Sequence, residues 1–571
     1  MLDFARAADS IAATGSTLEK TRLLGDYLAG LPDDDLRRAA IYMTGQPYGR
    51  SERRTLNLGG AIIGRALQQV AQPSGAPVWD LYLRHSDVGD WAREALTGHT
   101  RGEDLPLGDV ATRLEDIRQA PTIAEKERLL AGLLGTLDPE GARYLLKIIT
   151  FALRIGLQEG LVEAALAQAF DVPLASVRRV HMLTGDIGET ALRCRRGQLE
   201  NARLTLFVPL HFMLASPVET PAEAFQRMGM EASAGDPLAR PVGLWTEEKY
   251  DGVRCQLHVA ADGGADGRCE LFSRDLKETT TAFPELVEAA RELRRELVLD
   301  GEVLAHRDGH VLPFFELQRR LGRKQVSERM RRDVPIVLVV FDVLSLDGEA
   351  VMDLPLLQRR RLLEGLGLRP PFLLARVEEA FSVEELERIF HETRDRGNEG
   401  LMVKDPVSPY SPGRRGMSWL KVKRPLATLD VIVTAVEWGH GKRRGVLSDY
   451  TFAVRDDESG RLLNVGKAYT GLTDAEIAEM TRWFLDHTIA DHGRVRVVEP
   501  TIVAEVAFDS IQRSPRHRSG YALRFPRIVR LRSDKPLDEI DTVSRVEELY
   551  RRYFDRFVPL ARVAEAPEGD R

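Results

Sequence analysis

Hydrophobic residues recur at helical intervals through the first part of the chain. In GARYLLKIITFALRIGLQEGLVEAALAQAF, residues 141–170, apolar side chains fall every three or four positions, with charged residues between them. Gly156 and Gly160 interrupt this pattern. Alternation of the strand type is nearly absent here. We therefore predict an all-helical domain over residues 1–205.

A second region begins where proline and glycine become frequent, at about residues 205–241. Beyond it, apolar and polar residues alternate in VRCQLHV, residues 253–259, which predicts a half-buried strand. The continuous apolar run PIVLVVFDVLSL, residues 335–346, is typical of a central strand. Because helical stretches lie among these strands, we predict an α+β domain over residues 206–425.

The last region holds short strand-like runs separated by turns. They are LDVIVTAVEWG, YTFAVRD, LLNVGKAYTGL and TIVAEVAFDSI, with one helix-like stretch near residues 474–487. Several short strands at this spacing predict a small β-barrel over residues 426–562. The final residues, VAEAPEGDR (563–571), have little apolar surface to bury, and we predict a disordered tail.

Composition narrows the class of protein. A chain of 571 residues with 43% hydrophobic and 29% charged residues is typical of a globular protein of three or four domains. No apolar run approaches the ~20 residues that span a bilayer, and the N-terminus lacks the features of a secretory signal. Three cysteines cannot form a four-cysteine zinc site. We expect a cytoplasmic protein without a membrane partner, associated with the nucleoid in a bacterial cell.

The net charge of −7 argues against nucleic-acid binding only if the whole chain is averaged, because affinity follows local fields. Residues 513–535 carry eight lysines and arginines against one acid, Asp534. Two interpretations of this stretch stay open from composition alone. It is either a solvated charged surface or a contact with an anionic partner.

The segment TEEKYDGVR, residues 246–254, is the first candidate for chemistry. Asp251-Gly252 predicts a tight turn or bulge that would let Lys249 point into a cleft. A lysine amine can lose its proton and become a nucleophile, whereas an arginine cannot. Only 12 of the 80 basic residues are lysines, and five of them fall in the motifs described here. By itself, K-x-D-G more often marks a surface lysine beside a turn.

Further polar segments follow in order. SRD, residues 273–275, ends the next predicted strand, and LDGEV presents Glu302 after a second Asp-Gly turn. FDVL offers Phe341, an aromatic at the end of the apolar strand. EGLMVK then presents Glu399 and Lys404.

WLKVK, residues 419–423, has strict alternation. Lys421 and Lys423 share one strand face with Trp419, and the intervening residues face the opposite, buried side. Two lysines on one face repel each other unless an anion, such as a triphosphate, lies between them. The alternative is a strand that simply faces solvent.

Together these six segments resemble the signature of the covalent nucleotidyltransferase superfamily, which holds DNA ligases, RNA ligases and mRNA capping enzymes. RFPRIVRLRSDK, residues 524–535, resembles the DNA-ligase form of the last motif. ALRIGLQEGLV and TGDIGETA resemble the DNA-binding domain of cellular ATP-dependent DNA ligases. The resemblance implies a helical DNA-binding domain, an α+β adenylation domain and a C-terminal OB-fold.

The resemblance also implies a role for each matching residue at the nucleoside end. Lys249 matches the lysine that takes AMP, and Glu247 the glutamate that contacts adenine. Phe341 matches the ring that stacks on adenine, and Arg254 the arginine near the ribose and the nick. Arg274 matches the second motif, although the chain has Asp275 where asparagine is common.

The remaining matches concern phosphates and metal. Glu302 and Glu399 match carboxylates that contact ribose or hold a divalent metal, and Mg²⁺ prefers such oxygen ligands. The residues that match phosphate or pyrophosphate contacts are Lys421, Lys423, Arg527, Arg532, Asp534 and Lys535. The implied cofactors are therefore ATP and Mg²⁺.

The predicted function is sealing of 5′-phosphate/3′-hydroxyl nicks in duplex DNA, through lysyl–AMP and DNA–adenylate, in repair, replication or recombination. Nicked double-stranded DNA and ATP are the expected partners, and we expect a monomer. An RNA ligase or a GTP-using capping enzyme is the closest alternative, which the long helical region and the last motif disfavour. An NAD-dependent ligase would need four zinc-binding cysteines, and a non-catalytic DNA-binding scaffold would be expected to lose Lys249.

Overall fold

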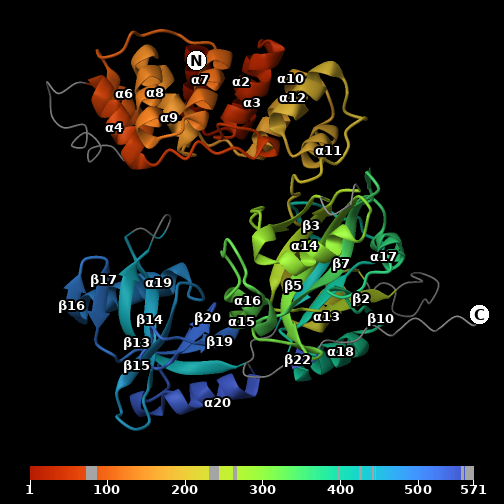
Figure 1. Cartoon of the computed structure of the whole chain (residues 1–571). Helices are drawn as coiled ribbons and strands as arrows, with labels where there is room; N and C mark the ends of the chain where they lie inside the picture. Colours follow the sequence, from red (N-terminus) through yellow and green to blue (C-terminus); the bar gives the residue numbers. More distant parts are fainter. Residues whose placement is uncertain are drawn as a thin grey trace, which may run out of the picture. The chain divides into compact units, whose positions relative to one another are not determined.

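The computed structural model describes residues 1–71, 87–229, 243–261, 267–396, 398–423, 427–439, 443, 445–553 and 558–559 (Figure 1). The chain divides into two compact units. The first is Met1–His211 together with Gly348–Ala350, which include β8 (Glu349–Ala350). The second is Phe212–Asp347 and Val351–Arg571. The predicted disordered tail, 563–571, lies outside the described residues.

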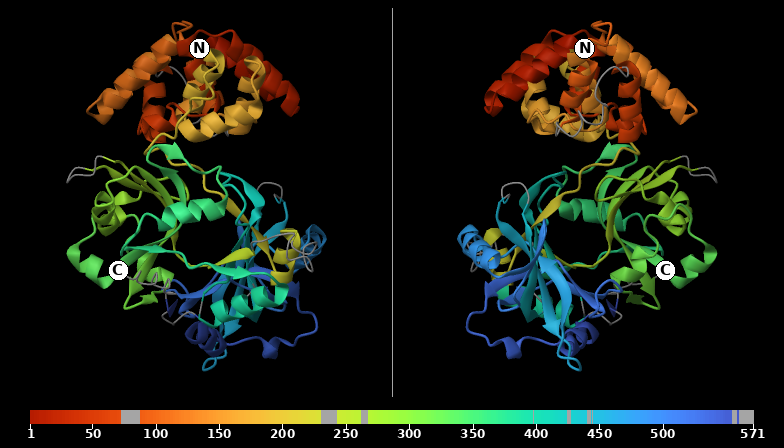
Figure 2. Two further views of the ribbon diagram at one scale, coloured as in Figure 1. Left: turned by 90° about the vertical axis from the view of Figure 1, so that its right-hand side faces the viewer. Right: turned by 90° about the vertical axis from the view of Figure 1, so that its left-hand side faces the viewer.

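The main part of the first unit is helical in every view (Figures 1 and 2), as predicted. Its elements are α1 (Leu2–Ala13), α2 (Thr17–Ala29), α3 (Asp33–Met43), η1 (Arg50–Glu52), α4 (Gly60–Ala71), α6 (Val88–Leu96), α7 (Leu107–Gln119), α8 (Ile123–Thr136), α9 (Pro139–Ile149), α10 (Glu159–Ala169), α11 (Leu174–Thr184) and α12 (Ile187–Arg196). Side-chain oxygens at the N-caps of several helices accept backbone N–H groups that would otherwise lack a partner, as Asp186 does from Glu189. One hydrophobic core joins these helices.

The periodic segment 141–170 forms two helices. The chain breaks between α9 and α10, where Gly156 adopts a positive φ of 70°. Gly160, which was also expected to interrupt the pattern, lies inside the first turn of α10. The helix continues through Gly160 to Ala169, so this glycine does not end it.

The second unit begins with two β-sheets. The first has the order β1-β12-β11-β2-β10, with β1 parallel and the others antiparallel to their neighbours. Its strands are β1 (Leu214–Val218), β2 (Leu244–Glu248), β10 (Glu378–Ala380), β11 (Leu401–Lys404) and β12 (Arg415–Val422). Helices α13 (Pro221–Arg227) and α18 (Val383–Asp395) share a hydrophobic core with these strands.

The second sheet has the order β22-β6-β5-β3-β4, with β7 beside β5 and β9 beside β7. Its elements are β3 (Val253–Val259), β4 (Cys269–Ser273), β5 (Leu297–Arg307), β6 (His310–Val311), β7 (Ile336–Leu346), β9 (Phe372–Leu374) and β22 (Val558–Pro559), with η3 (Thr280–Ala282), α14 (Pro284–Arg291), α15 (Phe314–Gln318), α16 (Glu328–Asp333) and α17 (Leu356–Glu364). The prediction of β7 as a central strand is confirmed, because it pairs on both sides.

Two details of this sheet differ from the predictions. Strand β3 is not half-buried, because Gln256 and His258 are both 0% exposed. His258 packs edge-on against Phe272 of β4, with ring centroids 5.0 Å apart, so both faces of this strand are covered. The polar positions therefore mark a second buried layer and not a solvent face.

The second difference concerns Asp300-Gly301, which is not a turn. Both residues lie within the continuous strand β5, at a register shift relative to β7. A Cβ on Gly301 would lie 2.7 Å from the carbonyl oxygen of Val339, so a larger residue would collide with the neighbouring strand. An isolated glycine in a strand marks such a bulge or close approach as readily as a turn.

The C-terminal part of the second unit is rich in strands, as predicted. Its elements are β13 (Thr428–Trp438), β14 (Leu447–Arg455), β15 (Leu462–Ala468), α19 (Asp474–Asp486), β16 (Thr488–His492), β17 (Val495–Val498), β18 (Val503–Ala507), β19 (Ser510–Arg513), β20 (Tyr521–Arg524), β21 (Arg527–Leu531), η5 (Leu537–Glu539) and α20 (Val543–Tyr553). Strand β13 pairs with β14 and β18, β14 with β15, and β18 with β21.

The two ends of this strand path approach each other. The backbone N–H of Ile528 in β21 donates to the carbonyl of Thr470, just after β15, at 3.0 Å. Gly471 makes the approach possible, since a Cβ there would lie 1.8 Å from the carbonyl oxygen of Ile528. The strand path β15-β14-β13-β18-β21, with its two ends linked by this hydrogen bond, is consistent with the OB-fold that was predicted.

Candidate active site

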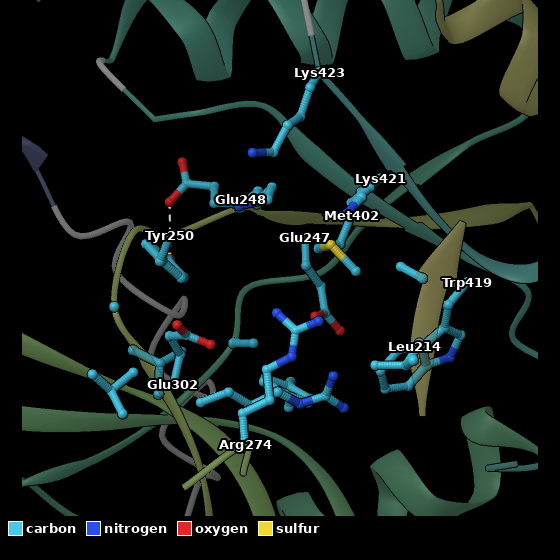
Figure 3. Close-up of a pocket in the computed structure, with 18 of the residues that line it drawn as sticks. Leu214, Glu247, Glu248, Tyr250, Arg274, Glu302, Met402, Trp419, Lys421 and Lys423 are labelled. Carbon is cyan, nitrogen blue, oxygen red and sulfur yellow. Dashed lines mark hydrogen bonds between the residues drawn. The ribbon is translucent and has the colours of Figure 1, made fainter. Parts of the chain in front are cut away.

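The β1-β12-β11-β2-β10 sheet and the β22-β6-β5-β3-β4 sheet border a cavity of about 690 Å³. Strands β2, β3, β5, β7, β11 and β12 contribute side chains to its wall, and Asp509 and Phe525 reach it from the C-terminal part. Figure 3 shows Glu247, Glu302, Arg274, Lys421 and Lys423 around this space. Motif residues that are up to 278 positions apart, from Glu247 to Phe525, are thus brought to one site.

Lys249 stands at the start of the loop between β2 and β3. Its backbone N–H donates to the carbonyl of Gly400 at 3.0 Å, and its Nζ donates to a carboxylate oxygen of Glu399. The following Gly252 passes so close to β5 that a Cβ would lie 2.5 Å from the carbonyl oxygen of Val303. The backbone that carries Lys249 is therefore fixed to both sheets.

Two carboxylates flank this lysine. Burial raises the pKa of Glu302 to about 7, and the charges of Lys249 and Arg254 oppose that rise. For Glu399, burial acts in the same upward direction, but Lys249 and Lys423 outweigh it and hold its pKa below the ordinary value. Both carboxylates are thus shielded from solvent and lie near positively charged side chains.

Arg254, at the start of β3, is held on all sides. Its guanidinium donates to both carboxylate oxygens of Asp300, at 3.0 and 2.7 Å, and to the carbonyl of Met213 at 2.8 Å. Tyr410 also donates its hydroxyl to Asp300 at 2.7 Å. The sequence did not single out Asp300 or Tyr410. The D of LDGEV was a signal for the first, but it was interpreted as part of a turn.

Aromatic rings line one end of the cavity. Phe341 lies in the middle of β7, not at its end as predicted, and meets Trp419 edge-on with ring centroids 6.0 Å apart. The strand continues past Phe341 because the next charge, Asp342, is buried in a two-fold hydrogen bond with Arg359 of α17, at 2.7 and 2.8 Å. Lys404 of β11 lies against both rings and donates to Glu247 at 2.6 Å.

Lysines line the other end. The predicted alternation of β12 is confirmed, because Leu420 and Val422 are buried while Lys421 and Lys423 border the cavity. Burial, together with the nearby charges of Lys423 and Lys249, lowers the pKa of Lys421 below its ordinary value. Such a site favours an anionic ligand.

Lys423 already has anionic partners. Its Nζ lies 3.0 Å from Glu399 and 3.1 Å from Asp509. Burial would lower the pKa of Lys423, but these two carboxylates raise it above the ordinary value. Asp509 follows β18 in the C-terminal part and was not singled out in the sequence, because the spacing of one aspartate after an apolar strand carries no signal of its own.

Arg274 of the second motif borders the cavity.

The residues of the last motif lie in two places. Arg527 binds Asp509, which lines the cavity, at 3.2 Å. Arg532 and Lys535 do not line the cavity; they bind Asp430 of β13 at 3.1 and 2.5 Å. Asp534 pairs with Arg532. These three predicted pyrophosphate contacts therefore lie apart from the others in this structure.

The arrangement agrees with comparisons to known proteins. Three family models match: "DNA ligase N terminus" over residues 1–167, "ATP dependent DNA ligase domain" over 212–423, and "ATP dependent DNA ligase C terminal region" over 443–535. A "Probable DNA ligase" of Koribacter versatilis is 44% identical, with 96% of each chain covered. The chain belongs to the ATP-dependent DNA ligase family.

Proteins of lower sequence identity also align with nearly the whole chain. A "DNA ligase" of Archaeoglobus fulgidus is 35% identical and covers 97% of this chain and 99% of its own. A solved structure titled "Pmar-Lig_PreS3" has a TM-score of 0.54 at 17% identity, covering 93% of this chain and 99% of its own, which supports the fold alone. The predictions of family, fold class and DNA-ligase reaction are confirmed. DNA and ATP are accordingly the ligase's substrates. Among the described helices of the ligase, none is long and apolar enough to cross a membrane.

Proposed function

We propose that this ligase seals 5′-phosphate/3′-hydroxyl nicks in duplex DNA, using Lys249 as the residue that carries AMP. The observation that carries the proposal is the position of Lys249 Nζ in a cavity with an aromatic end and a cationic end. Phe341 and Glu247 suit a purine, whereas Lys421 and Lys423 suit phosphates. A nucleoside triphosphate held between them presents its α-phosphate near Lys249.

In the first step, the neutral amine of Lys249 attacks the α-phosphorus. A bond forms between Nζ and phosphorus, and the bond from phosphorus to the pyrophosphate oxygen breaks. Lys421 and Lys423 neutralise charge on the phosphates, and Arg274 stands at the same wall. Glu399 accepts a hydrogen bond from Nζ and so is placed to receive the proton that the amine must lose.

Mg²⁺ is the metal we propose for this site. The donors present are carboxylate oxygens of Glu302 and Glu399, which fit a hard cation that binds one or two carboxylates together with substrate phosphates. Bound there, the metal would neutralise the phosphates and orient them for in-line displacement.

The remaining steps use the adenylated lysine. AMP passes from Lys249 to the 5′-phosphate at the nick, and the 3′-hydroxyl then attacks that phosphate and expels AMP. Arg254, held by Asp300 and Met213 beside the cavity, is placed to orient the ribose or the nick phosphate. We further infer three working domains, at 1–205, 206–425 and 426–562, with the first gripping duplex DNA chiefly through phosphates.

A joining assay tests this function. A 5′-phosphorylated nicked duplex is incubated with the protein and ATP, GTP or NAD, with Mg²⁺ or with a chelator. Sealed product is expected with ATP and Mg²⁺ and at most traces in the other reactions. Joining driven by NAD, or none with ATP, would contradict the proposal.

Lys535→Ala is expected to slow the first step by about 10²–10³-fold, the usual effect of removing one transition-state contact, yet to join a pre-adenylated nick at nearly the unmodified rate. Lys535 is bound to Asp430 outside the cavity, so it reaches departing pyrophosphate only if the C-terminal domain turns. Single-turnover rates of the two steps make the comparison.

Arg530→Ala is the matched control for this experiment. Arg530 lies on β21 in the same basic segment and pairs with Glu505. It should leave self-adenylation unchanged. Equal losses of both steps in Lys535→Ala would contradict the turning domain and indicate a patch that only supports the fold or binds DNA.

A further inference from the structure

A buried ion pair lies at the aromatic end of the cavity. Lys404 is 1% exposed and Glu247 is 5% exposed, and Lys404 Nζ donates to Glu247 Oε2 at 2.6 Å. Strands β11 and β2 are antiparallel neighbours, with Met402 opposite Glu247 and Lys404 opposite Trp245. The two residues are therefore diagonal neighbours on one face, the face that borders the cavity.

The cation of this pair is packed between rings. Lys404 Nζ lies 4.5 Å from the centre of Phe341 and 4.2 Å from the centre of Trp419. A buried ion pair seldom stabilises a fold better than two apolar residues of the same volume would. Its position beside Phe341, the ring proposed to stack on the base, indicates a role in ligand recognition.

We propose that Lys404 is the positioning residue that makes the site select a 6-amino purine over a 6-oxo purine. It does so by holding Glu247 as an acceptor beside the stacked base. This inference rests on the proposed function, because it requires a purine nucleotide between Phe341 and Lys249.

The selectivity follows from hydrogen-bond chemistry. A carboxylate paired with an ammonium group has only acceptor atoms, and its remaining lone pairs are open to a ligand. An adenine amine donates to such an acceptor, whereas the 6-oxygen of hypoxanthine or guanine would face it acceptor to acceptor. A buried mismatch of this kind lowers binding by a factor of about 10 to 100.

Without Lys404, Glu247 would lose the partner that keeps it an acceptor in this orientation. The carboxyl group would then either bind a proton and become a donor or turn toward solvent. In both cases a 6-oxo purine is no longer rejected. The loss is therefore one of discrimination between nucleotides, in addition to any loss of rate.

The test compares ATP with ITP in single-turnover formation of the lysyl–nucleotide adduct, using α-labelled nucleotides and Mg²⁺. The unmodified protein should prefer ATP, and Lys404→Met should reduce the ATP-to-ITP ratio of kcat/KM by about tenfold or more. A ratio that stays constant while both rates fall would overturn the inference and leave Lys404 with a purely structural role.

Lys421→Met is the matched control, since it removes an ammonium group from the phosphate end of the same cavity. It should lower both rates and leave the ratio unchanged. If Lys404→Met does not fold, as judged by thermal unfolding, Glu247→Gln decides the question. Its amide can donate to a 6-oxygen, so the ratio must fall there too, and an unchanged ratio overturns the inference. Absence of any adduct in the unmodified protein would instead contradict the proposed function.

Discussion

Lys249→Ala should abolish the covalent AMP adduct. The amine of Lys249 is the proposed nucleophile, and removal of a catalytic nucleophile costs on the order of 10⁶ in rate. Incubation with α-labelled ATP and Mg²⁺, followed by denaturing electrophoresis, measures the adduct directly. Lys249→Arg should be equally inactive, because a guanidinium group stays protonated and cannot attack phosphorus.

A matched lysine outside the cavity controls for nonspecific labelling. Lys467 of β15 pairs with Glu437 and does not border the cavity, so Lys467→Ala should be labelled as well as the unmodified chain. Labelling that persists in Lys249→Ala would place the nucleophile elsewhere. Lys249→Ala should still join a pre-adenylated nick, because that step does not need the amine.

Removal of residues 1–211 should separate nucleotide chemistry from DNA binding. These residues form a compact helical unit with their own hydrophobic core, and the whole cavity lies in the second unit. Self-adenylation should therefore remain close to the level of the full chain. Affinity for a nicked duplex should fall by about 10²-fold or more, since each lost phosphate contact removes part of the salt-dependent binding energy.

Equilibrium binding to a labelled nicked duplex at several salt concentrations checks this expectation. The full chain should weaken steeply with added salt, and the shortened chain should show a smaller slope. Adenylation of the shortened chain with α-labelled ATP shows whether the second unit is folded. Equal nick sealing by both chains at the same low concentration would mean that the helical unit is not the main DNA grip.

Several residues that border the cavity could be picked out from the sequence because they stand in short segments with recognisable spacing. Lys249 stands before Asp-Gly, and Lys421 and Lys423 alternate with apolar residues on one strand. Local patterns of this kind fix which face of a strand a side chain occupies. The fold then needs only to bring the segments together, which the two sheets do around one cavity.

The partners of these residues were harder to predict. Arg359 neutralises Asp342 from a helix that follows 17 residues later, and Tyr410 binds Asp300 from 110 residues away. Such contacts depend on long-range packing and leave no periodic trace. Gly301 is a further example, because its role depends on how closely β7 approaches β5. The sequence alone shows only an Asp-Gly pair, which predicts a turn.

Asp509, in the C-terminal part of the second unit, pairs with a lysine that borders the nucleotide cavity. Its carboxylate occupies Lys423, a cation expected to serve the triphosphate, so the placement seen here and a fully bound ATP compete for one ammonium group. The charge of Lys423 can thus be neutralised either by the phosphates of the nucleotide or by Asp509. When pyrophosphate leaves, Asp509 can pair with Lys423 again. Saturating ATP should accordingly weaken the ion pair between Lys423 and Asp509, and release of pyrophosphate should allow that pair to form again.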